Sequence, residues 1–443
     1  MLPITNNTSK QSLHPFQTRI QSRVNEFFDT RIAVTWGGMH LIDRDPPKPG
    51  AVNLSTNDYL NLSHHPRIAA AIRNQLASEH HSTLMSSLFL AKGGIQRTFE
   101  QEFAQLLGCE SSVLCQSGWA ANVGLIQSIA DETTNVYIDF LAHMSLWEGI
   151  RSARATPKPF RHNSPDHLRR LLKQNGPGII VVDSVYSTDG TICPLQEIVD
   201  LAGEYGCALV VDESHSIGTH GPKGSGLVCE LGLEDRVDFR TFSLAKAFAG
   251  RGGLITCTER FREYFLMESL PSIFSSALLP HEVAGFLETL KVIQQADKPR
   301  RQLQCNAQRL RDGLNELGFD TLGTETQIVC LMGGPEVNTL LMRQQLVKYD
   351  IHGAPFGPPA TPANRSLMRF TVRSDVSDSD IDRVIAACAT LLGKPYQPQM
   401  QKIRRHARPR RILTGPSRLT HPPINPGHGN VGNRIPPVAE NTV

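Results

Sequence analysis

A lysine and an aspartate follow two apolar, strand-like runs of this sequence. The acid opens Asp212-Glu-Ser-His215 directly after the run Ala208-Leu-Val-Val211, and the lysine closes Ser243-Leu-Ala-Lys246 after the run that starts at Val237. An amine and a carboxylate at the ends of two strands could hold the two ends of one flat, electron-withdrawing ring. Pyridoxal phosphate requires such a pair, because the amine forms a Schiff base with its aldehyde and the carboxylate keeps the pyridine nitrogen protonated.

Small residues before a predicted helix could bind the phosphate of the same cofactor. Ser117, Gly118 and Trp119 precede a helix expected to begin near Ala120. Exposed amides at such a helix start, helped by the helix dipole, suit an anion. The alternative is that this Ser-Gly turn is only a helix cap.

Two further side chains are candidates for the cofactor ring. His143 could lie flat on the pyridine, and Ser187, in a turn after a strand, could reach the phenolate oxygen. The alternatives are a histidine satisfied in the core or at the surface and an ordinary turn serine.

Length and composition describe a globular protein with more than one domain. The chain has 443 residues, of which 40% are hydrophobic and 20% charged, and this length exceeds what one core usually supports. A formal net charge of only +3 argues against a dedicated nucleic-acid binder. The nine cysteines lack CxxC spacing, so neither a disulfide framework nor a metal site is predicted.

The sequence shows no targeting or membrane signal. The polar opening Thr5–Lys10 lacks the apolar core of a secretory signal, and no apolar run approaches the ~20 residues of a membrane span. We therefore expect a cytoplasmic protein.

Apolar runs alternate with amphipathic stretches, which predicts an α/β fold with a mostly parallel sheet covered by helices. Strands are expected over 179–183, 208–212, 237–241 and 253–257, and helices over 68–79, 98–107, 195–205 and 300–317. We predict an N-terminal segment over 1–50, a large cofactor-binding domain over 51–280 and a small C-terminal domain over 281–392.

The last part of the chain, 393–443, is predicted to be a disordered tail. Residues 402–412 are basic, and the rest is rich in Pro, Asn and Gly with little to bury. The tail could contact anionic surfaces or nucleic acid, but charge runs are more often solvated extensions, so no clear nucleic-acid partner is expected.

The ordered motif set resembles the α-oxoamine synthases over residues of about 50 to about 392. The motifs are Asn57-Asp-Tyr-Leu60, Ser117-Gly-Trp-Ala-Ala-Asn122, His143, Ser187-Thr-Asp-Gly190, Asp212-Glu-Ser-His215, Ser243-Leu-Ala-Lys246 and Arg369. Those pyridoxal-phosphate enzymes have fold type I, the aspartate-aminotransferase fold, and join an amino acid to an acyl-coenzyme A. The resemblance implies a large, mostly parallel-sheet domain, a smaller C-terminal α+β domain and a homodimer with shared active sites.

Two longer runs, 136–149 and 176–184, together with Gly218-Thr-His-Gly-Pro222, resemble the α-hydroxyketone autoinducer synthases of quorum-sensing bacteria. That subgroup implies condensation of a long-chain acyl-coenzyme A with S-adenosylmethionine or 2-aminobutyrate. Loss of carbon dioxide then gives an α-aminoketone, the precursor of a hydroxyketone signal.

One segment departs from the housekeeping relatives. Where biotin-pathway and threonine-pathway members have a Gly-Ser-Arg-Leu stretch followed by a histidine, this chain has the apolar residues Leu84, Met85, Leu88, Phe89 and Leu90. They could line a tunnel for an acyl chain, since each buried methylene is worth roughly 0.8 kcal/mol. The alternative is ordinary core.

Residue by residue, the resemblance implies the following roles at the cofactor ring. Lys246 would hold the cofactor and then exchange the proton at the substrate Cα. Asp212 would pair with the pyridinium nitrogen and His143 would stack on the ring. His215 and Ser187 would bond the ring oxygen.

The phosphate would be bound by the backbone amides of Gly118 and Trp119, beside Ser117, and by Ser243. Ser275 and Ser276 match the segment that in the family reaches the phosphate of the neighbouring subunit.

The substrate carboxylate would be held by Arg369, with Asn57 nearby. Asp183 stands where other members have glutamate, so its contribution stays open. The amino donor and the acyl length are not legible in the motifs.

Other functions remain as alternatives. The nearest is a housekeeping oxoamine synthase of the 8-amino-7-oxononanoate synthase, serine palmitoyltransferase or glycine C-acetyltransferase type. A catalytically silent scaffold subunit would lose the Schiff-base lysine, whereas Lys246 is present. A regulator with a pyridoxal-phosphate domain needs a helix-turn-helix segment, which is not recognisable in the first ~50 residues.

Overall fold

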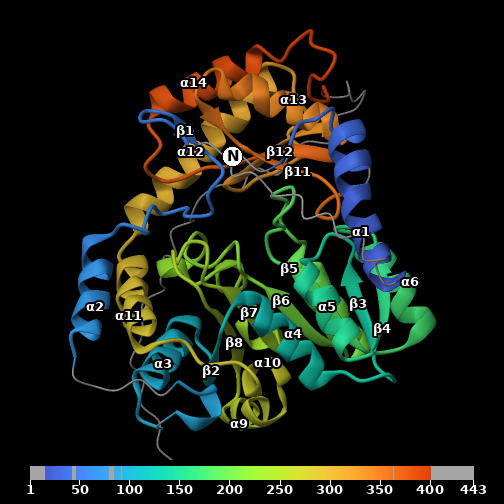
Figure 1. Ribbon diagram of the computed structural model, residues 1–443. Coiled ribbons are helices and arrows are strands. Elements are labelled where there is room, and N and C mark those ends of the chain that lie inside the picture. Colours follow the sequence, from blue (N-terminus) through green and yellow to red (C-terminus); the bar gives the residue numbers. More distant parts are fainter. Residues whose placement is uncertain (1–14, 42–45, 79–83, 91, 363, 401–443) are drawn as a thin grey trace, which may run out of the picture. The chain divides into compact units, whose positions relative to one another are not determined.

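A seven-stranded sheet forms the centre of the protein (Figure 1). The computed structural model describes residues 15–41, 46–78, 84–90, 92–362 and 364–400. The strand order is β2-β8-β7-β6-β5-β3-β4, and all neighbours are parallel except β8, which is antiparallel to both β2 and β7. The strands are β2 (Ser111–Cys115), β3 (Asn135–Asp139), β4 (Thr156–Phe160), β5 (Ile179–Asp183), β6 (Ala208–Asp212), β7 (Phe239–Ser243) and β8 (Gly253–Cys257).

Helices cover both faces of this sheet, which explains why its central strands are continuous apolar runs. Successive side chains of β5 point to opposite faces: Val181 belongs to the cluster under one helical layer, and Ile180 and Val182 belong to the cluster under the other. The first layer contains α4 (Gly118–Ile129), α5 (Met144–Ser152) and α9 (Glu259–Glu268), with α10 (Leu270–Ile273) against α4 and α9. The second contains α6 (Pro165–Asn175), α7 (Leu195–Tyr205) and α8 (Leu227–Glu230).

A second, three-stranded antiparallel sheet is built from the C-terminal part of the chain. Its order is β11-β12-β9, and it is accompanied by the two-residue parallel pair of β1 and β10. The elements are β1 (Val52–Asn53), β9 (Ile328–Gly334), β10 (Ile351–His352), β11 (Ala354–Phe356), β12 (Ser366–Thr371), α12 (Asp297–Glu316), α13 (Glu336–Val347) and α14 (Asp378–Ala389).

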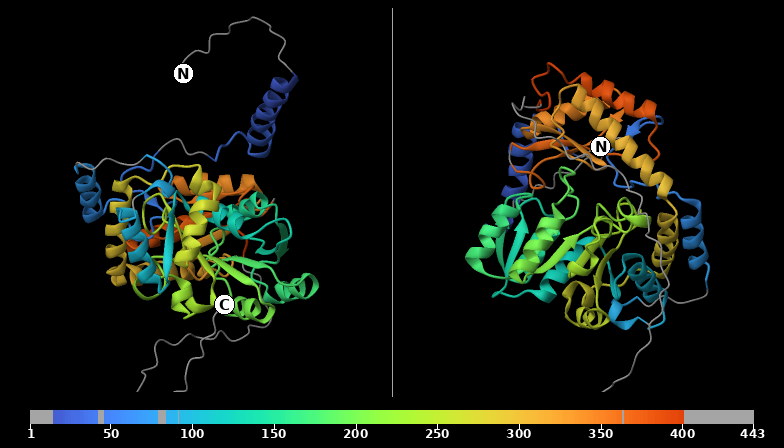
Figure 2. Two further views of the ribbon diagram at one scale, coloured as in Figure 1. Left: turned by 90° about the horizontal axis from the view of Figure 1, so that it is seen from below. Right: turned by 180° about the vertical axis from the view of Figure 1, so that it is seen from behind.

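The remaining helices come from residues 15–107 and 222–294. Helix α2 runs beside α11, as both Figure 1 and the right-hand view of Figure 2 show. These elements are α1 (Pro15–Glu26), the π-helix η1 (Phe27–Thr35), α2 (Pro66–Leu76), the 3₁₀ helix η2 (Ser87–Phe89), α3 (Ile95–Leu107), the 3₁₀ helices η3 (Pro222–Gly224) and η4 (Glu234–Arg236), and α11 (Pro280–Gln294).

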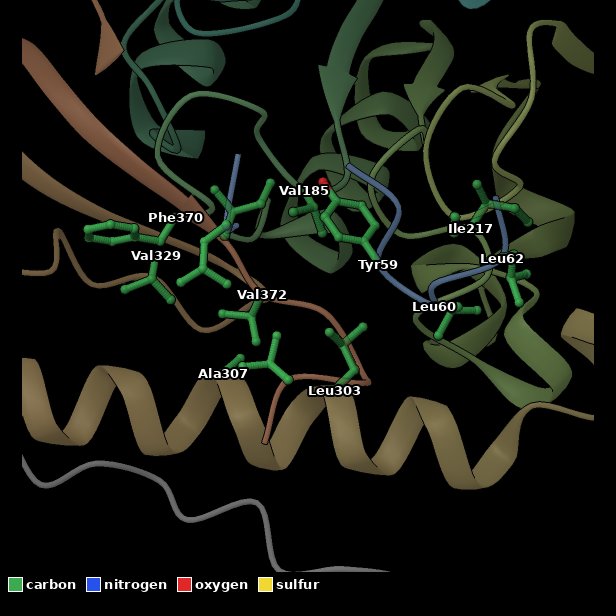
Figure 3. Packing of buried hydrophobic residues seen from close by; sticks show 14 of the residues in the cluster. Tyr59, Leu60, Leu62, Val185, Ile217, Leu303, Ala307, Val329, Phe370 and Val372 are labelled. Atoms are coloured by element: carbon green, nitrogen blue, oxygen red, sulfur yellow. The ribbon is translucent and has the colours of Figure 1, made fainter. Parts of the chain in front are cut away.

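One hydrophobic cluster joins the N-terminal motif region to the small sheet. Figure 3 shows Tyr59 and Val185 packed near Phe370 of β12 and Leu303 of α12. The expected domain boundary at residue 280 coincides with the start of α11, but this cluster continues across it. The arrangement therefore places residues 54–62 where they can contact both sheets.

The strands and helices expected from the sequence agree with the structure to within a few residues. The strand expected at 237–241 is β7 at 239–243, because the Asp238 side chain accepts a hydrogen bond from the Leu209 amide at 2.7 Å and pairing begins one residue later. Helix α2 begins at Pro66 rather than at residue 68, since proline is favoured in the first helical turn.

The start of the expected tail requires a correction. The Gln399 amide donates to Met332 O at 2.9 Å, and Met400 pairs with Phe319. Gln399 and Met400 thus pair with β9 and with the residues that follow α12, which the polar composition of the segment did not predict. The rest of the expected tail lies outside the described residues.

Candidate active site

A cavity of about 240 Å³ opens where the parallel strands β5, β6 and β7 end. Asp183 and Asp212 are register partners at the last positions of β5 and β6, so their carboxylates lie side by side. The carboxyl edge of parallel strands is the usual ligand site of such sheets. The lining residues are Ser117, Gly118, Trp119, Asn122, His143, Asp183, Asp212, Ser214, His215, Ser243 and Lys246.

Asp212 is buried, and both of its oxygens accept hydrogen bonds. Asn122 Nδ2 donates to Oδ2 at 2.7 Å, and the Ser214 amide donates to Oδ1 at 2.9 Å. Two N–H donors stabilise a negative carboxylate. Asp212 can therefore supply the fixed negative charge that a protonated pyridine nitrogen needs.

Asp183, whose contribution was open from the sequence, lies in the cavity wall. Burial, followed by the neighbouring charge of Asp212, raises its pKa well above the ordinary value. Its Oδ1 accepts a hydrogen bond from the His143 amide at 3.2 Å. Asp183 thus orients the start of α5 through the His143 amide.

Lys246 follows β7 and reaches the same cavity. Burial is the largest influence on its amine and lowers its pKa, Asp212 and Asp183 oppose this effect, and Arg369 adds to it. A lowered pKa increases the fraction of neutral amine, which is the nucleophilic form. The geometry therefore suits Schiff-base formation at Lys246.

His215 is held by two residues that the sequence did not single out, Tyr59 and Gln327. The Tyr59 hydroxyl lies 2.6 Å from His215 Nδ1, and Gln327 Nε2 donates to the His215 carbonyl at 2.8 Å. Burial, then the charges of Lys246 and Arg369, lower the pKa of His215 well below its usual range, and burial raises the pKa of Tyr59. Both groups are neutral at pH 7, so a single hydrogen is shared between the Tyr59 oxygen and His215 Nδ1, and this contact fixes the orientation of the imidazole ring.

His143 caps the N-terminus of α5. Its Nδ1 accepts a hydrogen bond from the Ser145 amide at 3.3 Å, and its ring meets the Trp119 ring edge-on at a centroid distance of 6.3 Å. Part of His143 is exposed, but surrounding atoms still lower its pKa by desolvation, against the opposing charge of Asp212. A neutral ring at this position can stack on a flat cofactor.

The predicted phosphate site has the close backbone approach that an anion cradle requires. Ser117 caps α4 by accepting from the Ala120 amide, and a Cβ on Gly118 would lie 2.6 Å from Ser243 Cβ. A Cβ on Gly253, at the start of β8, would lie 2.2 Å from Ser117 O. Only glycine fits at these two positions, so the first amides of α4 stay open to an anion.

Arg369 and Asn57 are brought together, as the sequence predicts. Arg369 Nη2 donates to Asn57 Oδ1 at 2.7 Å, and Nη1 donates to the Ser187 carbonyl at 2.5 Å. Arg369 is 5% exposed, and its Nε has no hydrogen-bond partner among the described residues. Ser187 contributes its carbonyl to this pair, and it is not among the residues that line the cavity.

Four predicted residues lie on the surface of the single chain. Ser275 and Ser276 are exposed after α10, and Leu88 and Phe89 are exposed in η2. The Ala277 amide donates to Met85 O at 2.8 Å, so the two segments are adjacent. In the described part of one chain, the side chains of Leu88 and Phe89 are therefore exposed instead of buried around an acyl tunnel.

Several residues that line the cavity or hold its side chains were missed by the sequence analysis. Asn122 closes the quoted run 117–122, but an asparagine inside a helix gives no signal of its own. Ser145 and Ser214 lie two residues from His143 and Asp212, which is a spacing that turns and caps share. Gln327 lies far away in sequence and could be found only in the fold.

Among the described residues, no group of three or more His, Cys, Asp or Glu side chains is arranged to hold a metal ion. No helix in the described ranges is both long and apolar enough to cross a membrane.

Comparisons with known proteins agree with this geometry. The family model for aminotransferases of class I and II matches residues 49–387. The CAI-1 autoinducer synthase of Vibrio campbellii is 45% identical over 388 residues, covering 88% of this chain and 98% of that protein. The 8-amino-7-oxononanoate synthase of Geotalea daltonii is 33% identical over 345 residues, covering 76% and 87%.

A solved structure has the same fold. Serine palmitoyltransferase from S. paucimobilis with bound pyridoxal phosphate and myriocin aligns with a TM-score of 0.76 and 25% identity, covering 84% of this chain and 97% of that one. The expected fold type I is thereby confirmed. This protein belongs to the aminotransferase class I and II family and, within it, to the α-oxoamine synthases, as its motifs predict.

Proposed function

We propose that the protein is a pyridoxal-phosphate-dependent C-acyltransferase. It condenses a long-chain acyl-coenzyme A with an amino donor, S-adenosylmethionine or 2-aminobutyrate, and releases carbon dioxide and coenzyme A. The product is an α-aminoketone precursor of a hydroxyketone signal. The observation that carries the proposal is that Lys246, Asp212, His143 and His215 meet around one cavity in a chain 45% identical to a CAI-1 autoinducer synthase.

The residues present fit pyridoxal phosphate. Lys246 and Asp212 line one cavity, and Gly118 leaves the first amides of α4 uncovered beside Ser243. Lys246 would bind the aldehyde carbon, Asp212 the pyridine nitrogen and His215 the ring oxygen. When bound, the cofactor supplies an electron sink that stabilises a carbanion at the substrate Cα.

The side chains of the protein then control protons and charge. Lys246, with its lowered pKa, would accept the proton at the substrate Cα and would later return a proton to the same carbon. Arg369 and Asn57 hold the substrate carboxylate until it leaves as carbon dioxide. Asp212 would be held toward the ring nitrogen by the two N–H groups that donate to its carboxylate.

The acyl chain and the second subunit belong to the same proposal. Exposed apolar side chains of η2, Leu88 and Phe89, lie next to the exposed Phe274, Ser275 and Ser276. A homodimer would cover these surfaces, bring Ser275 and Ser276 to the phosphate of the partner and give the acyl chain its second wall. A cytoplasmic location remains part of the proposal.

A substrate panel tests this function. The purified protein is incubated with pyridoxal phosphate, acyl-coenzyme A thioesters of increasing length and either amino donor, and products are identified by mass spectrometry. We expect aminoketones and a kcat/KM that rises with acyl length. A maximum with a short acyl thioester and alanine or glycine would contradict the signal-synthase proposal and favour a housekeeping oxoamine synthase.

A further inference from the structure

Two buried side chains lie between Asp212 and His143. Asn122 on α4 is 2% exposed, and Ser145 on α5 is fully buried. Asn122 Nδ2 lies 2.7 Å from Asp212 Oδ2 and 2.9 Å from Ser145 Oγ. Ser145 Oγ in turn lies 2.7 Å from His143 Nδ1. A continuous line of hydrogen bonds therefore joins the two sides of the cavity.

The direction of each hydrogen bond follows from the groups involved. An amide nitrogen carries two hydrogens, and a carboxylate accepts only, so Asn122 donates to both Asp212 and Ser145. The Ser145 hydroxyl accepts from Asn122 and keeps its own hydrogen for His143 Nδ1. The Ser145 amide also donates to Nδ1, so Nδ1 accepts and the neutral ring carries its proton on Nε2.

The chemistry of Asn122 argues against a simple packing role. Its neighbours in α4, Ala121, Val123, Leu125 and Ile126, are buried and apolar. Its Oδ1 has no hydrogen-bond partner among the described residues, and a buried unpaired carbonyl is costly. An apolar side chain would avoid this cost. An apolar residue, however, could not supply the two hydrogens with which Asn122 Nδ2 donates to Asp212 and Ser145.

We propose that Asn122 and Ser145 are positioning residues that hold Asp212 and His143 as one unit. Asn122 fixes the Asp212 carboxylate so that its remaining lone pairs face the cavity, and Ser145 fixes the tautomer and orientation of His143. The inference rests on the proposed function only in assigning the cofactor to this cavity.

The first test measures His143 in the cofactor-free full chain. Nitrogen-15 NMR of histidine-labelled protein distinguishes the two tautomers, and His143→Gln identifies the signal. We expect the Nε2–H tautomer in the parent, and a growing Nδ1–H population in Ser145→Ala and, to a lesser degree, in Asn122→Ala. Ser128→Ala is the matched control, because Ser128 bonds the Gly124 carbonyl on the outer side of α4.

The second test measures cofactor affinity by absorbance titration of the same variants. Each single variant should bind pyridoxal phosphate roughly tenfold more weakly, and the double variant no more than about twofold weaker than the worse single one. Asn175→Ala, at the end of α6, is the control for asparagine and should bind normally.

Two results would overturn the inference: an unchanged His143 signal in both single variants, or a double variant whose loss equals the product of the single losses. If an alanine variant does not fold, the NMR measurement on Ser145→Cys and Asn122→Ser decides in the same way. A parent chain that binds no pyridoxal phosphate would contradict the proposed function while leaving the NMR test intact.

Discussion

Arg369 lies over the ring of Phe356, with its guanidinium carbon 4.4 Å from the ring centroid. The two residues are on the adjacent antiparallel strands β12 and β11, two positions of register apart, because Arg369 is paired with Ala354 and Phe356 with Leu367. Together with Asn57 and the Ser187 carbonyl, the aromatic ring fixes a buried guanidinium whose Nε remains unpartnered among the described residues. The cation is thus oriented before any carboxylate arrives.

Replacing Phe356 should therefore affect the amino donor and not the acyl donor. Phe356→Leu is expected to raise KM for the amino donor about fivefold to tenfold with little change in kcat, because a desolvated cation–π contact is worth roughly 1 kcal/mol or more. Phe356→Tyr keeps the ring face and should behave like the parent. Steady-state kinetics with each substrate varied in turn measures the two KM values separately. Equal changes in both KM values would contradict the prediction and show a general loss of structure.

Lys246→Ala should remove the covalent link to pyridoxal phosphate. In the parent, borohydride should fix the cofactor to a peptide that contains Lys246, because this amine has a lowered pKa and lies in the cavity. Peptide mapping by mass spectrometry makes the measurement. Lys291→Ala on the exposed face of α11 serves as the control and should keep the link. A link mapped to another lysine would remove Lys246 from its assigned role.

Asp212→Asn should bind the cofactor weakly and lose turnover by roughly 10²–10³-fold or more, because a neutral amide no longer stabilises a protonated ring nitrogen. Turnover and thermal stability are measured together, since the variant also changes the bonds to Asn122 and Ser214. Asp235→Asn, at an exposed position, should keep parental turnover. Near-parental turnover of Asp212→Asn would mean that another group holds the ring.

Gly118→Ala should weaken cofactor binding and destabilise the fold by about 1–3 kcal/mol, since the new Cβ would overlap Ser243 Cβ. Gly203→Ala on α7 is the matched control, because its nearest neighbour would be the Arg236 guanidinium at 4.0 Å. That control should be neutral or slightly stabilising. Denaturant unfolding and cofactor titration separate the two effects.

Stability should fall in mild acid because His215 is buried in the neutral form. Its pKa is well below the ordinary 6.5 in the folded chain, so the unfolded chain binds the extra proton first. The stability that depends on neutral His215 is fully present above about pH 7.5. It is lost as the pH falls through about 6.5, which is the pKa of a histidine in the unfolded chain. Asp183 has the opposite effect on the pH dependence of stability. Its pKa is raised in the folded chain, so its contribution to the free energy of unfolding is lost as the pH rises.

A comparison of two variants separates the effect of His215 on the pH dependence of stability from that of other histidines. The difference in Tm between pH 7.5 and pH 5.5 should be smaller in His215→Gln than in the cofactor-free parent. His64→Gln, at an exposed position, should show the parental difference. An unchanged difference in His215→Gln would contradict a neutral, buried His215.

The sequence was sufficient to predict the site residues whose positions follow from a local pattern of apolar and polar residues. Lys246, Asp212 and His215 each follow a strand or turn whose apolar run is legible, so their convergence could be predicted from the parallel order of β5, β6 and β7. The pairing of Arg369 with Asn57 was expected only through the family resemblance, because the two residues are far apart in the chain.

The other features of the site could not be predicted, because they depend on packing between segments that are far apart in the chain. The Tyr59 contact to His215 exists only because residues 54–62 pack between the two sheets, as Figure 3 shows for Tyr59. The role of Asn122 depends on the spacing of α4 and α5 over the sheet, which no local pattern encodes. The surface position of Leu88 and Phe89 could not be foreseen, since an apolar run reads the same in a core and at an uncovered face.

Strand β8 runs against its neighbours, so its first residue, Gly253, lies beside the ends of β2 and β7. The strand that completes the phosphate cradle contributes no side chain to it and is the last of the seven to be synthesised. A nascent chain on the ribosome therefore lacks the cradle until β8 has emerged and inserted between β2 and β7. Tight binding of the phosphate therefore requires the complete sheet and not only the strands that carry Asp212 and Lys246.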